Sequence, residues 1–106
     1  MAFVRALSTT DLGEGQGRCV TLSGKKIAIF HANGRWFAID DTCTHEDASL
    51  AEGSVVEHAG QCSVECPWHG AQFDLATGAA LTLPAVKPVK TYPVRVQGTG
   101  VEVDVT

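Results

Sequence analysis

Residues 25–40 read KKIAIFHANGRWFAID, and this stretch decides the fold class. Apolar and aromatic side chains on both sides of Asn33-Gly34 predict two strands, over residues 25–31 and 36–40. Asn-Gly accepts the positive φ angles of a two-residue turn, so the two strands are expected to pair as an antiparallel hairpin. The expected buried rows of this hairpin are Ile27, Ile29, Phe37 and Ile39.

The rest of the chain repeats this pattern of short strands and glycine-containing turns. Residues 94–96 and 101–105 form a second alternating pair around residues 97–100, and further strands are expected at residues 18–22, 71–74 and 3–7. Val, Ile and Thr, which favour strands because they branch at Cβ, supply 25 of the 106 residues. The expected fold class is all-β, an antiparallel sandwich or small barrel that hides its apolar faces.

Length and composition limit the possible functions. A chain of 106 residues that is 44% hydrophobic corresponds to one globular domain. Its formal net charge of −4 disfavours nucleic-acid binding, which depends on Lys and Arg. No apolar run approaches the roughly 18 residues of a membrane span, and the first residues lack the apolar core of a signal peptide. We therefore expect a monomeric, cytoplasmic protein that binds neither membranes nor nucleic acid.

Two short motifs carry the chemistry, Cys43-Thr44-His45 and, further along, Cys66-Pro67-Trp68-His69. Each places one thiolate donor and one imidazole donor on what is expected to be a loop. A lone Cys is often only a small buried side chain, and a lone His is often structural, but two such pairs together indicate a metal site. Zinc would take all four donors in one tetrahedron. A two-iron cluster would instead take both thiolates on one iron and both imidazoles on the other.

The spacing Cys43-Thr44-His45 … Cys66-Pro67-Trp68-His69-Gly70 resembles the signature of the Rieske [2Fe–2S] proteins, Cys-x-His … Cys-x-x-His-Gly. Similarity extends to residues 40–42, 48–53, 72–74, 77–78 and 83–88, and the last of these segments resembles the proline-containing loop that covers the cluster in that family. The resemblance implies a single Rieske domain over residues 1–106, with a cluster-binding subdomain of two loops at about 41–86. It also implies one Rieske-type [2Fe–2S] cluster bound by Cys43, His45, Cys66 and His69.

The details resemble one branch of the family, the small ferredoxins of bacterial aromatic-ring-hydroxylating dioxygenase systems. The loops lack the extra disulfide-forming cysteines of the respiratory members, and Ala71 stands where those members carry a hydroxyl. Fewer donors to the cluster sulfurs imply a potential near the low end of the Rieske range of about −150 to +300 mV. The implied function is one-electron transfer, without catalysis, from a flavin-dependent ferredoxin reductase to a terminal oxygenase. Two alternatives stay open: the small subunit of an NADH-dependent nitrite reductase, and a zinc-stabilised interaction module.

Charge and the remaining special side chains add further expectations. Residues 36–86 contain eight acidic residues and no Lys or Arg, which predicts an acidic face around the cluster loops. The longer interval between the loops is interpreted as a surface hairpin around residues 58–62, with Cys62 on a strand and not a ligand. Cys19 is expected to be buried, Trp36 to be core, and Trp68 to shield the cluster or its loop. His31 and His58 are interpreted as structural or exposed.

Overall fold

The computed structural model describes residues 3–44, 48–68, 70–82 and 87–105. Within these ranges the chain consists of short strands and a single turn of 3-10 helix, η1 (Leu50–Glu52). The strands are β1 (Phe3–Ser8), β2 (Gln16–Leu22), β3 (Lys25–Ala32), β4 (Arg35–Asp40), β5 (Ser54–His58), β6 (Gln61–Glu65), β7 (Gln72–Asp74), β8 (Thr91–Tyr92), β9 (Val94–Gln97) and β10 (Gly100–Asp104). This arrangement confirms the predicted all-β fold class.

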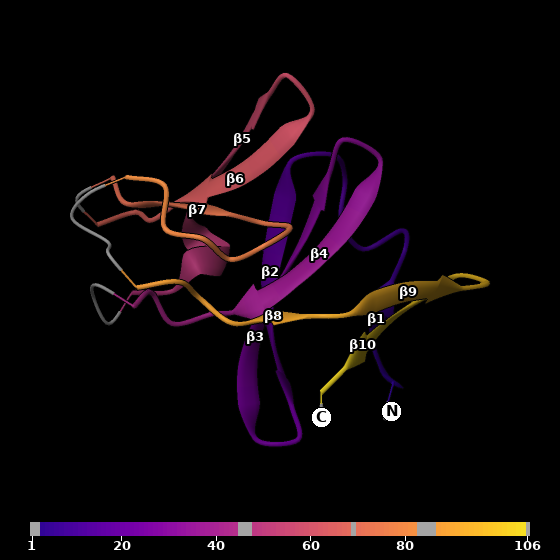
Figure 1. Ribbon diagram of the computed structural model, residues 1–106. Helices are drawn as coiled ribbons and strands as arrows, with labels where there is room; N and C mark the ends of the chain where they lie inside the picture. Colours follow the sequence, from indigo (N-terminus) through magenta and orange to yellow (C-terminus); the bar gives the residue numbers. More distant parts are fainter. Residues whose placement is uncertain (1–2, 45–47, 69, 83–86, 106) are drawn as a thin grey trace.

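The strands form three antiparallel sheets, with the strand orders β1-β10-β9, β2-β3-β4-β8 and β5-β6-β7. Figure 1 shows the β5-β6-β7 sheet and the β1-β10-β9 sheet on different sides of the four-stranded sheet. The predicted strands at 3–7, 18–22, 25–31, 36–40, 71–74, 94–96 and 101–105 all correspond to observed strands, with small differences at their ends.

The central strand β3 is buried on both of its faces, which explains why its sequence is almost continuously apolar. Ile27 and Ile29 face one core, which also contains Val101 and Val103 of β10. Ala28 and Phe30 face a second core, which contains Val64 and Phe73 of the β5-β6-β7 sheet and the cysteines of both motifs. The four-stranded sheet is therefore the middle layer of the protein, and one of its faces supports the candidate metal centre.

The predicted row of buried side chains in the first hairpin needs one correction. Ile27, Ile29 and Ile39 are fully buried, but Phe37 is only half-buried. Phe37 lies opposite Phe30 in the β3–β4 register, toward the turn end of the hairpin, where the Arg35 guanidinium lies 5.3 Å from its ring centroid. A side chain at this margin of the second core is covered on one side only.

Two-residue turns join four of the strand pairs, and in three of these turns both residues have positive φ. These three turns are Ser23-Gly24, Asn33-Gly34 and Ala59-Gly60, and the second is the predicted hairpin turn. The Asn33-Gly34 turn is held from outside by Glu14, whose carboxylate accepts the N–H groups of both turn residues. The Ala59-Gly60 turn joins β5 to β6 and confirms the predicted surface hairpin, with Cys62 on a strand.

The loops of interest lie at one end of the molecule. Figure 1 shows the chain on either side of the first and second motifs reaching the left edge of the view, whereas the β9–β10 hairpin occupies the opposite end. The described residues contain no helix long and apolar enough to cross a membrane.

Candidate metal centre

The two cysteine motifs are built into loops with the same backbone closure. The first loop follows β4, and the N–H of Cys43 donates to the carbonyl of Ala48 at 3.0 Å. The second loop follows β6, and the N–H of Cys66 donates to the carbonyl of Ala71 at 2.6 Å. In both loops the cysteine therefore bonds to the residue five positions later. This repetition means that each cysteine stands at the entrance of an equivalent narrow loop.

The thiols of both loops point into one apolar core. Cys43 is 4% exposed and Cys66 is 1% exposed, and both belong to the core that includes Phe30 and Phe73. None of the four cysteines, all of which lie in the described residues, forms a disulfide. Two thiols from matched loops in one shielded site fit the thiolate half of a two-iron cluster, whose other iron takes imidazoles.

The predicted histidine ligands, His45 and His69, lie outside the described residues. The described residues alone contain no group of three or more His, Cys, Asp or Glu arranged as a metal site. The structure thus places the two cysteine donors in one core, while the assignment of the two histidines remains a prediction from the motifs.

Cys62 is as buried as the two loop cysteines but lies elsewhere on the sheet. It is the second residue of β6, opposite Glu57, and its Sγ lies 3.7 Å from the Arg35 guanidinium. Four residues of extended chain separate it from Cys66, which corresponds to about 13 Å. Such a distance is too long for both thiols to bind one iron, which supports the interpretation that Cys62 is not a ligand.

The two ends of a third segment, Thr82 and Lys87, contact the second and the first loop respectively. The hydroxyl of Thr44 donates to the carbonyl of Lys87 at 2.8 Å, which fastens the first loop to the far end of this segment. The hydroxyl of Thr82 accepts the N–H of Gln72 at 2.9 Å and lies 3.4 Å from the carbonyl of Gly70, which fastens the second loop to its near end. Most of the predicted proline-containing loop, residues 83–86, lies outside the described residues. Its two described flanks nevertheless bind the two cysteine loops separately.

No motif in the sequence indicates these hydroxyl contacts. Thr44 was visible only as the middle residue of the first motif, and Thr82 had no assigned role. Their partners are 43 and 12 residues away in the chain. Hydrogen bonds at such separations depend on how the loops are packed, and only the tertiary structure reveals them.

Lysine residues lie near the first loop, while the acidic face expected around both loops stays a prediction. Lysines approach this loop from neighbouring segments: the carbonyl of Lys26 accepts the N–H of Asp41, and the carbonyl of Lys90 accepts the N–H of Asp40. Lys87 contacts Thr44, as described above, and its side chain is exposed. Lysine residues from outside residues 36–86 therefore contact the first loop and its base through their main chain, and their side chains are exposed. Glu46 and Asp47, in the same loop, lie outside the described residues.

Acidic residues instead gather on the β5-β6-β7 side. Glu52 and Glu57 are exposed, and Glu65, the last residue before Cys66, is half-buried. The end of the molecule that carries the cysteine loops is thus dipolar, with lysines beside the first loop and carboxylates on the strands that lead to the second.

Two single-residue expectations, for Cys19 and Trp68, differ from the structure. Cys19 is exposed and not buried as predicted, because β2 is an edge strand of the four-stranded sheet. The pKa of this thiol is nevertheless raised, by partial desolvation of its sulfur and by the neighbouring Asp41 carboxylate, with which it forms a hydrogen bond, so it is not an activated thiolate. Trp68 is 58% exposed, so its ring faces solvent and does not form the expected shield within the described structure.

The histidine expectations hold, whereas Trp36, expected in the core, lies at the margin of it. Trp36 packs against the first core while remaining half-buried, and it stacks on His31 with ring centroids 4.2 Å apart. The Nδ1 atom of His31 lies 3.2 Å from the carbonyl oxygen of Leu12, and His58 is exposed. Both histidines therefore have the structural or exposed positions predicted for them.

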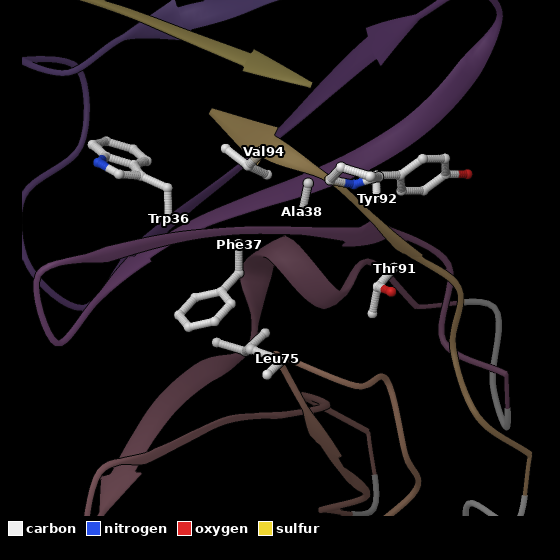
Figure 2. Close-up of a pocket in the computed structure, with 9 residues that line it drawn as sticks. Trp36, Phe37, Ala38, Leu75, Thr91, Tyr92 and Val94 are labelled. Atoms are coloured by element: carbon white, nitrogen blue, oxygen red, sulfur yellow. The ribbon is translucent and has the colours of Figure 1, made fainter. Parts of the chain in front are cut away.

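A pocket of about 370 Å³ lies away from the cysteine motifs, where the chain passes from β8 to β9. Figure 2 shows Phe37, Leu75 and Thr91 on one side of β4, with Trp36, Ala38 and Val94 on the other. Its lining residues include neither Cys, His nor an acidic side chain. The pocket therefore lacks the donors of a metal site and is separate from the candidate centre.

Comparisons with known proteins agree with the site chemistry. A family model described as the Rieske [2Fe-2S] domain matches residues 2–93. The chain is 45% identical, over 106 residues, to the 3-phenylpropionate/cinnamic acid dioxygenase ferredoxin subunit of Photorhabdus laumondii, an alignment that covers 100% of this chain and 97% of that protein.

Two solved structures have the same fold over nearly their whole lengths. The ferredoxin of carbazole 1,9a-dioxygenase from Nocardioides aromaticivorans has a TM-score of 0.87 and 34% identity, and the match covers 97% of each chain. The putative NADH-dependent nitrite reductase small subunit from Mycobacterium tuberculosis also has a TM-score of 0.87, at 27% identity, covering 96% of this chain and 93% of that one. Backbone similarity does not separate these two kinds of protein, whereas sequence identity is higher for the dioxygenase ferredoxins.

Proposed function

Because this chain belongs to the Rieske [2Fe–2S] domain family, we propose that it is the ferredoxin component of an aromatic-ring-hydroxylating dioxygenase system. The observation that carries the proposal is its 45% identity, along the full chain, to a dioxygenase ferredoxin subunit. The matched closure of the two cysteine loops supports it from the structure. The protein holds one Rieske-type cluster and acts as an electron carrier, not as an enzyme.

We assign the cluster ligands to Cys43 and Cys66 on one iron and to His45 and His69 on the other. When bound, the cluster supplies a centre that accepts and releases one electron. The chain's own contribution is to hold two thiolates at loop entrances, to bury them, and to tie both loops to the segment that ends at Lys87. Residues of about 41–86 constitute the proposed cluster-binding subdomain of a single domain.

The proposed partners are a flavin-dependent ferredoxin reductase, which supplies electrons, and a terminal oxygenase, which receives them. The named substrates of the relative from Photorhabdus laumondii make 3-phenylpropionate and cinnamate the first aromatic acids to test. We propose that the carrier works as a cytoplasmic monomer, since it must leave one partner to reach the other. A weak docking interface, below about 1,200 Å², suits such exchange.

The dipolar end of the molecule suggests how docking is oriented. A partner that approaches the loops would meet lysines at Lys87 and Lys90 and carboxylates at Glu52 and Glu65. A complementary partner surface therefore needs acidic groups opposite the first loop and basic groups opposite the β5-β6-β7 side. Electrostatic steering of this kind raises association rates by about 10–10³-fold and weakens as salt increases.

The alternative function is the small subunit of an NADH-dependent nitrite reductase. The structural match to such a subunit favours it, but the identity is only 27%. The family assignment gives no support to the third candidate, a closed zinc site.

The test uses the purified holoprotein with both sets of partners. The proposal expects two irons and two acid-labile sulfides per chain, reduction by NADH through the flavin reductase, and reoxidation by the terminal oxygenase with an aromatic acid. Stable copurification with a nitrite reductase large subunit, without electron transfer to any ring-hydroxylating oxygenase, would contradict it. Stoichiometric zinc in protein isolated from its native host would contradict the cluster itself.

Matched cysteine variants test the ligand assignment. Cys43→Ser and Cys66→Ser are expected to lose the visible spectrum of the cluster, because each removes a thiolate ligand. Cys62→Ser is the control: it changes an equally buried cysteine in the same core and is expected to keep the cluster. Loss of iron from the Cys62 variant, with retention in the Cys66 variant, would show that the wrong thiol had been assigned.

A further inference from the structure

Asp41 is a buried carboxylate at the base of the first cysteine loop. Asp41 lies two residues before Cys43 and is only 4% exposed. Among the described residues, no Lys or Arg side chain forms an ion pair with Asp41. The ion pair that these residues do form joins Arg95 to Glu102, at the other end of the molecule. Burying a charge without a cation is costly unless hydrogen bonds compensate, so the contacts of this carboxylate call for an explanation.

The side chain of Asp41 forms hydrogen bonds across the base of the loop. Its Oδ1 atom accepts two hydrogen bonds, from the hydroxyl of Ser49 at 2.8 Å and from the N–H of Ala51 at 3.0 Å. Both donors lie on the returning arm of the loop, beyond the residues of the motif. One carboxylate oxygen therefore joins the outgoing arm to the returning arm.

The main chain of Asp41 fastens the same base in two directions. Its carbonyl accepts the N–H of Leu50 at 2.7 Å, and its N–H donates to the carbonyl of Lys26 at 3.0 Å. The next pairs along the loop are the Thr42–Ser49 bridge and the bond from Cys43 to Ala48. Asp41 is thus the first step of a short ladder whose next steps lead directly to the cysteine.

The charge of Asp41 has a second consequence for a redox centre. Reduction adds one electron, and hence one negative charge, to the group that Cys43 is proposed to bind. A carboxylate in a shielded environment interacts with that charge more strongly than an exposed one, because little water or salt lies between them. Net charge around an iron–sulfur cluster is one of the factors that set its potential.

We propose that Asp41 is a positioning residue that sets both the geometry of the first ligand loop and the potential of the bound cluster. Its accepted hydrogen bonds hold the Cys43 arm in place, and its negative charge disfavours the reduced state. The inference rests on the proposed function, because it takes Cys43 as a cluster ligand. The two effects can be separated by substitution, because asparagine keeps an acceptor oxygen at the same position but removes the charge.

The experiment compares four variants of the holoprotein by potentiometric titration and by the rate of iron release to a chelator. Asp41→Asn is expected to keep the iron content and the visible spectrum of the wild type while the midpoint potential becomes more positive. Asp41→Ala removes both hydrogen bonds as well, and is expected to release iron faster than the asparagine variant. Ser49→Ala removes one hydrogen bond and no charge, so iron release should rise roughly twofold to tenfold with an unchanged potential.

Glu52→Gln is the matched control for charge. It also removes one carboxylate, on η1 and next to Ala51, but this side chain is exposed and screened by solvent. Its potential should move much less than that of Asp41→Asn. A potential that is the same in Asp41→Asn and wild type, or that moves equally in the Glu52 variant, would overturn the charge argument. Equal iron release from Asp41→Ala and Asp41→Asn would overturn the positioning argument.

These outcomes are distinct from failure of the proposed function. A wild-type protein without a reducible two-iron cluster would refute the function before any variant is compared. A wild-type protein that has the cluster, with Asp41 variants that all match it, would refute only this inference.

Discussion

Gly53 provides a sharp test of how η1 and β6 are packed beside the second cysteine loop. It follows η1, donates its N–H to the carbonyl of Leu50 at 2.9 Å, and precedes β5. A Cβ added at this position would lie 2.2 Å from the carbonyl oxygen of Glu65, the residue directly before Cys66. Gly53→Ala therefore forces apart two main-chain segments, one of which leads into the ligand loop.

The size of the effect follows from this contact. The φ of Gly53 is −77°, a value that alanine adopts without strain, so the whole effect is steric. Ordinary contact begins near 3.4 Å, so the segments must separate by about 1 Å, and overpacking of this kind costs about 1–3 kcal/mol. For a domain of this size we expect the apparent melting temperature to fall by about 5–15 °C. Because Cys66 moves with Glu65, the cluster should also be released faster at a fixed temperature.

The assay follows the visible absorbance of the cluster during a thermal scan at one heating rate, and then during incubation below the transition. Two glycines provide matched controls. Gly13→Ala meets only a flexible Gln16 side chain at 3.4 Å, so its stability should stay within about 0.5 kcal/mol of the wild type. Gly15→Ala meets nothing within 4 Å but has φ +81°, so it reports backbone strain alone. A Gly53 variant that behaves like the Gly13 variant would refute the packing argument.

Three further outcomes follow from individual contacts. Burial, together with the hydrogen bond that its hydroxyl donates to Asp40 at 2.5 Å, raises the pKa of Tyr92 to about 12 from an ordinary value of 10.0. The unfolded chain therefore loses this proton first, and the free energy of unfolding should fall as pH rises from about 10 to about 12, a slope that Tyr92→Phe should remove in denaturant titrations. Lys87→Glu should slow stopped-flow electron transfer to the oxygenase at low salt and leave the visible spectrum unchanged, whereas Arg5→Glu, at the other end, should have little effect; equal rates would show that docking ignores the lysines. Arg35→Met removes the donor to the Gly60 carbonyl at 2.8 Å and should loosen the β5–β6 hairpin, seen as faster amide exchange in β6 with unchanged exchange in β10.

Much of the fold was predictable because its signals are local. Asn33-Gly34 specifies a turn with two positive φ angles, and the neighbouring apolar residues form strands whatever the rest of the chain does. The surface hairpin around residues 58–62, with Cys62 on a strand, was likewise predicted, and it corresponds to β5 and β6. The number of sheets was not, because which face of β3 meets which partner depends on contacts between segments far apart in the sequence.

The exposure of single residues was the least predictable property. Cys19 lies in a correctly predicted strand, yet it is exposed because β2 lies at a sheet edge. Trp68 has a large apolar side chain, which is suited to shielding a cluster from water, but this side chain is largely exposed to solvent. In both cases the sequence specifies the type of side chain, while the position of the element in the fold specifies its environment.

The all-β class, the first hairpin and the Rieske type of the metal centre were readable in the amino-acid sequence, because turn conformation and donor spacing are properties of a few adjacent residues. The assignment of the individual ligands stays a prediction. Only the tertiary structure decided that the two cysteine loops share one closure and one core, that Thr44 is tied to Lys87, and that lysines border the first loop. Asp41 illustrates the difference. The sequence shows that it lies two residues before Cys43, but its proposed role depends on the hydrogen bonds that Ser49 and Ala51 donate to it in the folded chain. Hydrogen bonds and charges act through distance in space, and chain folding alone brings these groups together.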